Sequence, residues 1–132
     1  MNKKYLIVVA DYYKNIAKGL LKSANDLLPK STSIKIINVP GVFEIPVTIS
    51  KNIKKYDGFL ALGCVIKGET PHFNFISQVS TDAIMKLSID YKKPIGNGII
   101  TCLNMQQAIA RKKKGGEAAQ AVMSILSQKK WE

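Results

Sequence analysis

The chain has 132 residues, of which 46% are hydrophobic, and it carries a formal net charge of +11. This length suits one domain with a buried core, so residues 1–132 are expected to fold as a single unit. No apolar run approaches the roughly 20 residues of a membrane span, and the run near the N-terminus is shorter than a signal-peptide core, which together predict a cytoplasmic protein.

Strand-like and helix-like segments alternate along the whole sequence. Continuous apolar and β-branched runs are typical of strands buried on both faces, and apolar residues three or four apart are typical of helices packed on a sheet. The predicted elements, in chain order, are a strand at 5–10, a helix at 16–28, a strand at 33–39, a helix at 44–55, a strand at 59–66, a helix at 72–91, a strand at 94–101, a helix opening at Asn104 and a last helix at 117–127.

Proline, glycine and capping residues set the expected ends of these elements. Pro46 is tolerated because it falls in the first turn of its helix, where its missing N–H would have no partner. Asn104 followed by Gln107 three residues later is a capping-box arrangement. The pair Gly115 and Gly116 is expected to break the helix that Asn104 opens from the last one.

Strands that alternate with helices require parallel pairing through right-handed crossovers. The expected fold is therefore an α/β protein, a flavodoxin-like three-layer α/β/α sandwich around a four-stranded parallel sheet. Ligands bind such sheets at the carboxyl ends of the strands. Segments 11–13, 39–44 and 63–73 follow the first three strands, so a site is expected among them.

Several side chains in these segments have both a functional and a structural explanation. The loop at 68–70 precedes a helix, where backbone N–H groups and the helix dipole can hold an anion. His72, the only histidine, is either a base kept neutral by that dipole or a surface residue. Glu44 suits a helix start with or without a ligand, and Tyr12 either stacks on a flat ligand or packs under its loop.

The basic residues and the cysteines bear on whether the chain binds phosphate, nucleic acid or a metal. Arg111 is the only arginine among twenty basic residues, so it either marks a place where a bidentate fork binds phosphate or stands there by chance. The lysines are spread along the chain and no recognition motif accompanies the cluster at 111–114, so no nucleic-acid partner is expected. Cys64 and Cys102 lack metal or redox spacing and are interpreted as small buried residues, so no metal site is predicted.

The motifs VPGVFEIP at 39–46, GCVIKGETPH at 63–72 and QAIAR at 107–111 occur in this order, and together they resemble the lumazine synthase family. The resemblance extends from Tyr5 to Leu126. It implies condensation of 5-amino-6-(D-ribitylamino)uracil with 3,4-dihydroxy-2-butanone 4-phosphate to 6,7-dimethyl-8-ribityllumazine, the penultimate step of riboflavin biosynthesis. It also implies a transferase that uses no metal or organic cofactor and works as a homo-oligomer, a pentamer or a multiple of one.

The resemblance assigns roles to individual residues. His72 would shuttle protons, Tyr12 would stack on the pyrimidine, and Arg111 with Lys114 would bind the phosphate. The other substrate contacts would come from Val42, Phe43 and Glu44 at the ribityl chain, from Cys64, Val65 and Ile66 around the ring, mainly through backbone groups, and from the backbone amides of Glu69 and Thr70 at the phosphate.

The chain departs from the family pattern at several positions. Glu69 stands where a small residue is usual, and a carboxylate beside a bound phosphate is repulsive unless it turns outward. Asn97 occupies a position usually held by an aromatic residue that closes the ring pocket, so stacking is lost there. Ala110 stands where a glutamate often precedes the arginine, and the segment after Arg111 is shortened, which affects the alignment of Lys114.

The positions of these residues predict a site that is shared between subunits. Tyr12, Glu44 and His72 follow the first three strands, whereas Asn97 lies within the fourth strand and Arg111 about two turns into the next helix. The last two residues therefore need not reach their own chain's site. We expect one chain to contribute the first group and its neighbour the second.

Two functions of other kinds remain alternatives. One is an archaeal-type riboflavin synthase, a paralogue that would dismutate the lumazine product, and the segment around His72 argues against it. The other is a non-catalytic flavin- or nucleotide-binding module, which the loss of an aromatic residue at Asn97 favours slightly.

Overall fold

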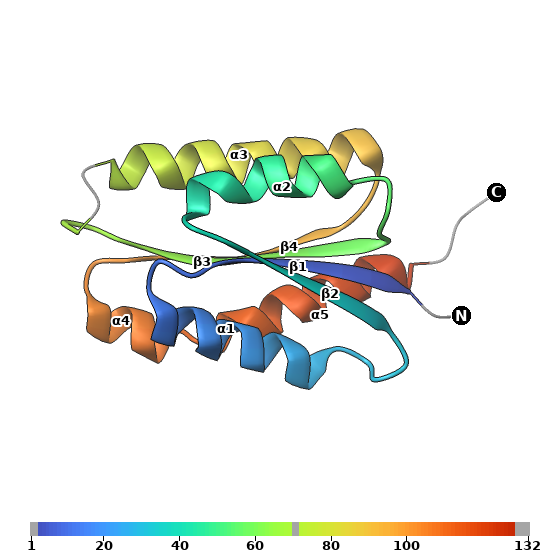
Figure 1. Ribbon diagram of the computed structural model, residues 1–132, viewed down its shortest axis with the longest axis horizontal. Coiled ribbons are helices and arrows are strands. Elements are labelled where there is room, and N and C mark those ends of the chain that lie inside the picture. Colours follow the sequence, from blue (N-terminus) through green and yellow to red (C-terminus); the bar gives the residue numbers. More distant parts are fainter. Residues whose placement is uncertain (1–2, 70–71, 129–132) are drawn as a thin grey trace.

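The computed structural model describes residues 3–69 and 72–128. One sheet with parallel strands lies between two layers of helices (Figure 1). Its strand order is β2-β1-β3-β4, which confirms the predicted flavodoxin-like α/β sandwich. The elements in chain order are β1 (Lys4–Ala10), α1 (Lys14–Leu27), β2 (Ser33–Val39), η1 (Val42–Glu44), α2 (Ile45–Asn52), β3 (Gly58–Ile66), α3 (Phe73–Tyr91), β4 (Ile95–Cys102), α4 (Met105–Ala110) and α5 (Lys114–Leu126).

The place of each strand in the sheet explains its burial. β3 lies between β1 and β4 and is buried at all nine positions, which accounts for its uninterrupted apolar run. β2 forms one edge and is buried only at its last residue, Val39. Helices α2 and α3 cover one face of the sheet, and α1, α4 and α5 cover the other (Figure 1).

Alternate side chains of β3 enter two separate apolar cores. Leu60 and Leu62 pack with residues of α1 and α5, whereas Phe59 and Ala61 pack with residues of α2 and α3. Burial of one large apolar side chain stabilises a fold by about 1.5 to 3 kcal/mol. Both layers of helices are therefore held by the same central strand. Within the described residues, none of the helices has both the length and the apolar character needed to cross a bilayer.

The predicted helix break at Gly115 and Gly116 is wrong. Both glycines are buried in the first turn of α5, and the interruption between α4 and α5 falls at 111–113. A Cβ on Gly115 would lie 1.9 Å from the carbonyl oxygen of Leu20 in α1. Glycine is needed there because the two helices touch through their backbones, and a glycine pair in the sequence does not distinguish this role from helix termination.

Side chains determine two other helix ends. The Asn104 cap is confirmed, because its Oδ1 accepts the N–H of Gln107 at 2.9 Å. The Gln107 amide oxygen accepts the N–H of Leu103 at 2.7 Å, one residue earlier than a standard capping box requires. Helix α2 ends at Asn52, three residues before the predicted end. The Lys93 ammonium donates to the carbonyl of Ile53 at 2.8 Å and so satisfies one of the carbonyls left at this helix end.

Candidate functional site

A pocket of about 230 Å³ opens at the carboxyl ends of β1 and β3. The chain leaves β1 toward β2 and then crosses to β3 on the other side, so this is the switch point at which open α/β sheets bind ligands. Most of its wall is apolar or aromatic, and we refer to it as the apolar pocket. Its lining residues are Tyr12, Tyr13, Val42, Phe43, Cys64, Val65, Glu69 and Ile76.

The sequence around the strand ends explains the wall of the apolar pocket. A Cβ on Gly63 would lie 2.8 Å from a methyl group of Val42, so glycine in β3 allows the η1 turn to approach the sheet. The Tyr12 ring meets the Tyr13 ring edge to face, with 4.9 Å between their centroids. Tyr12 is 68% exposed, so its side chain is open to a flat ligand at the pocket mouth.

The Cys64 thiol is held in its neutral form. Burial, together with the nearby Cys102 and Glu69, raises its pKa to about 12. The thiolate is the form that acts as a nucleophile or metal ligand, and at neutral pH almost none is present here. Cys64 therefore contributes shape and apolar surface to the pocket.

Glu44 and His72 lie near the apolar pocket without lining it. Glu44 ends η1 and is half-buried, and its backbone carbonyl accepts the hydroxyl of Thr48 at 2.9 Å. His72 is exposed at the N-cap of α3, and its imidazole makes no capping hydrogen bond. Its carbonyl accepts the N–H of Ile76 at 2.8 Å, which places His72 one helical turn from a residue of the pocket wall.

A second cavity of about 580 Å³ follows β4 and the turn between α4 and α5. We refer to it as the basic recess, because three of its side chains are cations and only one is a carboxylate. Its lining residues are Asn97, Ile99, Ile100, Thr101, Ala110, Arg111, Lys113, Lys114 and Glu117.

The charged groups of the basic recess are only loosely engaged. The Arg111 guanidinium donates from Nη1 to the carbonyl of Thr101 at 3.0 Å. The Lys114 ammonium lies 3.5 Å from a carboxylate oxygen of Glu117, and both side chains are well exposed. Exposed ion pairs of this kind contribute little stability, so a phosphate group can compete for the same cations.

Asn97 has a structural partner in the basic recess. Its Oδ1 accepts the N–H of Ile99 at 3.0 Å. β4 is an edge strand with β3 on one side only. The Ile99 N–H points away from β3, and the asparagine side chain supplies its hydrogen-bond acceptor. The side chain therefore turns toward its own strand.

Residues 2–130 match the family described as 6,7-dimethyl-8-ribityllumazine synthase. The chain belongs to this family. Several proteins that carry that name are similar to the chain over nearly their whole length. They include those of Bartonella tribocorum (44% identical, over 98% of this chain and 93% of the relative), Agrobacterium fabrum (41%, over 98% and 97%) and Bartonella henselae (46%, over 95% and 87%).

The lumazine synthase fold of this chain brings together part of the set that the motifs indicated. Tyr12, Val42, Phe43, Cys64, Val65 and Glu69 line the apolar pocket. Ile66 is buried in the core beside α1 and α5 and lines neither cavity. Thr70 lies outside the described residues.

The remaining indicated residues form a second group. Asn97, Arg111 and Lys114 come together in the basic recess, and this recess shares no lining residue with the apolar pocket. Among residues 3–69 and 72–128, no three His, Cys, Asp or Glu side chains gather as a metal site would require.

The lining also includes residues that the sequence does not mark as site residues, among them Tyr13, Lys113 and Ile76. Tyr13 follows Tyr12 in the same segment after β1, and Lys113 belongs to the basic cluster at 111–114. The sequence points to both segments but does not show which of the adjacent residues line the cavities. Ile76 lies one turn into α3, where its helical spacing indicated only core packing.

Proposed function

We propose that this chain condenses 5-amino-6-(D-ribitylamino)uracil with 3,4-dihydroxy-2-butanone 4-phosphate to 6,7-dimethyl-8-ribityllumazine, the penultimate step of riboflavin biosynthesis. The observation that carries the proposal is the match of almost the entire chain to the lumazine synthase family. The two cavities agree with it. An apolar pocket suits the flat pyrimidine, and a separate basic recess suits the phosphate of the second substrate.

The reaction depends on orientation and on proton transfer. An amine of the uracil attacks the ketone carbon, and loss of water gives an imine. Elimination then breaks the carbon–oxygen bond to phosphate, and the second amine closes the ring with loss of another water. In this proposal the exposed His72 imidazole moves protons in these steps, and Arg111 and Lys114 hold the departing phosphate.

The separation of the two cavities supports an active site completed by two copies of the chain. Exposed apolar side chains lie in, or close in sequence to, the segments that line each cavity. Tyr12 and Phe43 line the apolar pocket, and Val47 follows Phe43 by four residues. Leu103, Met105 and Ile109 lie between Thr101 and Ala110, two residues that line the basic recess. A head-to-tail ring would bring the first set against the second at every interface. We therefore propose a homopentamer, or a multiple of one, whose active sites lie between subunits.

The two alternative functions are not favoured by the family match. A riboflavin synthase would form riboflavin from the lumazine alone, and a non-catalytic module would bind the pyrimidine without turnover. Both predictions differ from those of the lumazine synthase, which requires two substrates.

A turnover assay with both substrates tests the proposal directly. We expect the absorbance and fluorescence of the lumazine to appear together with one equivalent of inorganic phosphate, and only when both substrates are present. Riboflavin formed from lumazine alone, or binding of the pyrimidine without product, would contradict the proposal.

A further inference from the structure

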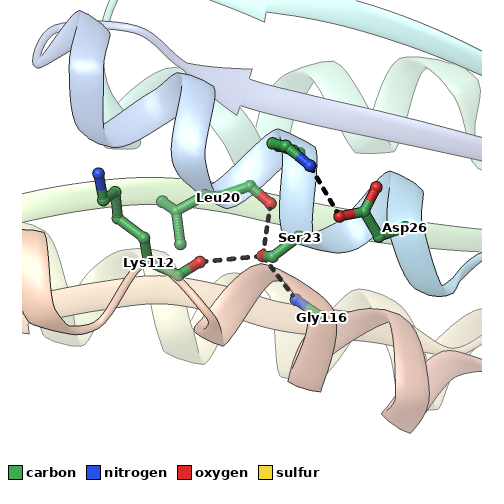
Figure 2. A network of polar contacts seen from close by, with 6 residues as sticks. Leu20, Ser23, Asp26, Lys112 and Gly116 are labelled. Carbon is green, nitrogen blue, oxygen red and sulfur yellow. Dashed lines mark hydrogen bonds and ion pairs between the residues drawn. The ribbon is translucent and has the colours of Figure 1, made fainter.

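Ser23 of α1 holds the turn between α4 and α5, although the two elements are far apart in sequence. Its Oγ lies 2.9 Å from the carbonyl oxygen of Lys112 and 3.0 Å from the backbone nitrogen of Gly116. It also lies 3.0 Å from the carbonyl oxygen of Leu20 in its own helix. Figure 2 shows the hydroxyl between these three groups. The serine therefore donates its proton to a carbonyl and accepts the N–H of Gly116.

The two backbone groups that Ser23 contacts, the Lys112 carbonyl and the Gly116 N–H, would bond to each other in a continuous helix. Lys112 and Gly116 are four residues apart, so the N–H of Gly116 would donate to the carbonyl of Lys112. Here the Gly116 nitrogen lies 3.0 Å from the Lys113 carbonyl oxygen and 3.0 Å from Ser23 Oγ, and its N–H is shared between them. A side chain inserted into the helical hydrogen-bond ladder is an established cause of a kink. Ser23 thus helps to separate α4 from α5.

Two glycines fix the same turn against α1. A Cβ on Gly19 would lie 2.2 Å from the Cδ of Lys112, whose side chain packs over this glycine. A Cβ on Gly115 would lie 1.9 Å from the Leu20 carbonyl oxygen. Because of these contacts the turn has little room to shift along α1. The Lys112 stem is directed to α1, whereas Arg111, Lys113 and Lys114 line the basic recess.

We propose that Ser23 is a positioning residue for phosphate binding. It lines neither the apolar pocket nor the basic recess, and it acts by fixing the turn that carries Arg111, Lys113 and Lys114. This inference rests on the proposed function for its link to the sugar phosphate. The anion-binding part of it is independent of turnover.

The test compares Ser23→Ala with Ser124→Ala. Ser124 is a matched control, because its hydroxyl lies within hydrogen-bond distance of the carbonyl three residues earlier, as that of Ser23 does, but has no hydrogen bond to another element among the described residues. Loss of a hydrogen bond worth about 1 kcal/mol should weaken binding of inorganic phosphate, measured by calorimetry, about fivefold in Ser23→Ala. The KM for the sugar phosphate should rise by a similar factor, while the KM for the pyrimidine should stay within twofold. Ser124→Ala should match the wild type in all three measurements.

Two outcomes would overturn the role of Ser23. One is an unchanged phosphate affinity in Ser23→Ala, and the other is an equal rise in both KM values. If Ser23→Ala does not fold, Ser23→Cys replaces it, because the thiol keeps a weak donor of similar size and should give a smaller rise of the same selective kind. If the wild-type protein binds phosphate but does not turn over the two substrates, the proposed function fails while the calorimetric comparison still decides the role of Ser23.

Discussion

The apolar pocket and the basic recess are built in different ways. The pocket is part of the sheet, since Cys64 and Val65 are the buried end of β3 and Gly63 lets η1 close over them. Apart from the buried Ile99 and Ile100, the recess consists of exposed or half-buried side chains on the edge strand β4 and around the turn between α4 and α5. The shape of the pocket is therefore fixed by the core. The orientation of the cations in the recess depends instead on how the turn between α4 and α5 is held.

This difference predicts different failures at the two sites. Loss of His72, which lies beside the pocket without lining it, should lower the rate of the chemical steps without a selective loss of one substrate. A change in the recess should weaken the phosphate substrate and leave the pyrimidine unaffected. Each substitution below tests one side of this division.

The largest expected effect is that of His72→Ala. Because we assign proton transfer to this exposed imidazole at the start of α3, kcat should fall by about 10²- to 10⁴-fold. Steady-state kinetics with both substrates measure the effect. Asn74→Ala, an exposed change in the same helical turn, is the control and should stay near wild type. A His72→Ala enzyme within twofold of wild type would remove His72 from the chemistry.

Arg111→Lys should have the next largest effect. The lysine keeps the charge but loses the planar fork, so the KM for the sugar phosphate should rise by about 10- to 100-fold. The KM for the pyrimidine should be unchanged, and this internal comparison separates a phosphate role from general damage. A loss of pyrimidine affinity with a normal KM for the sugar phosphate would show that Arg111 binds the pyrimidine and would contradict its phosphate role.

Gly115→Ala tests the packing that holds the recess in place. The added methyl group would be forced against the Leu20 carbonyl, and strain of this kind costs about 1 to 3 kcal/mol in the free energy of unfolding. Urea denaturation at constant protein concentration measures it. Gly116→Ala is the matched control, and its loss of unfolding free energy should be smaller. The new Cβ would lie 3.0 Å from its nearest neighbour, a methyl group of Leu27. Equal losses in both variants would mean that α1 and α5 are less tightly packed than described.

The smallest expected effect concerns the pH dependence contributed by the pocket. The pKa of Cys64 is raised to about 12, against an ordinary value of 9.0. Above pH 9 the unfolded chain releases this proton while the folded chain keeps it, so the thiol makes stability fall as pH rises from 9 toward 12. In Cys64→Ala that part of the loss disappears, so near pH 10 its curve of stability against pH should be shallower by about 1 kcal/mol per pH unit. Parallel stability curves for the two proteins between pH 8 and pH 10.5 would contradict the burial of this thiol.

The sequence predicted the fold because its strongest signals are local. The apolar run at 59–66 is typical of a strand buried on both faces, which β3 is, and Asn104 with Gln107 indicates a helix start within four residues. The resemblance places Cys64 and Val65 around the ring, and both line the apolar pocket. Glu69, which the resemblance places at the phosphate, lines the apolar pocket too and not the basic recess.

The features that could not be predicted depend on partners distant in the sequence. Nothing around Ser23 indicates that its hydroxyl meets a carbonyl 89 residues away. The Gly115 and Gly116 pair predicts a helix break because the sequence does not show that the Leu20 carbonyl packs against Gly115. The basic recess depends on these long-range contacts, so its geometry was less accessible from the sequence than that of the apolar pocket.

The central claim is that the two cavities act together across a subunit interface. It is tested most directly by co-refolding two inactive variants, His72→Ala and Arg111→Ala, in equal amounts. In a head-to-tail ring assembled at random, about a quarter of the interfaces would pair an intact pocket side with an intact recess side. We expect roughly a quarter of wild-type activity after mixing and none when either variant is refolded alone. No recovery in confirmed mixed oligomers would place His72 and Arg111 in the site of a single chain and contradict the account.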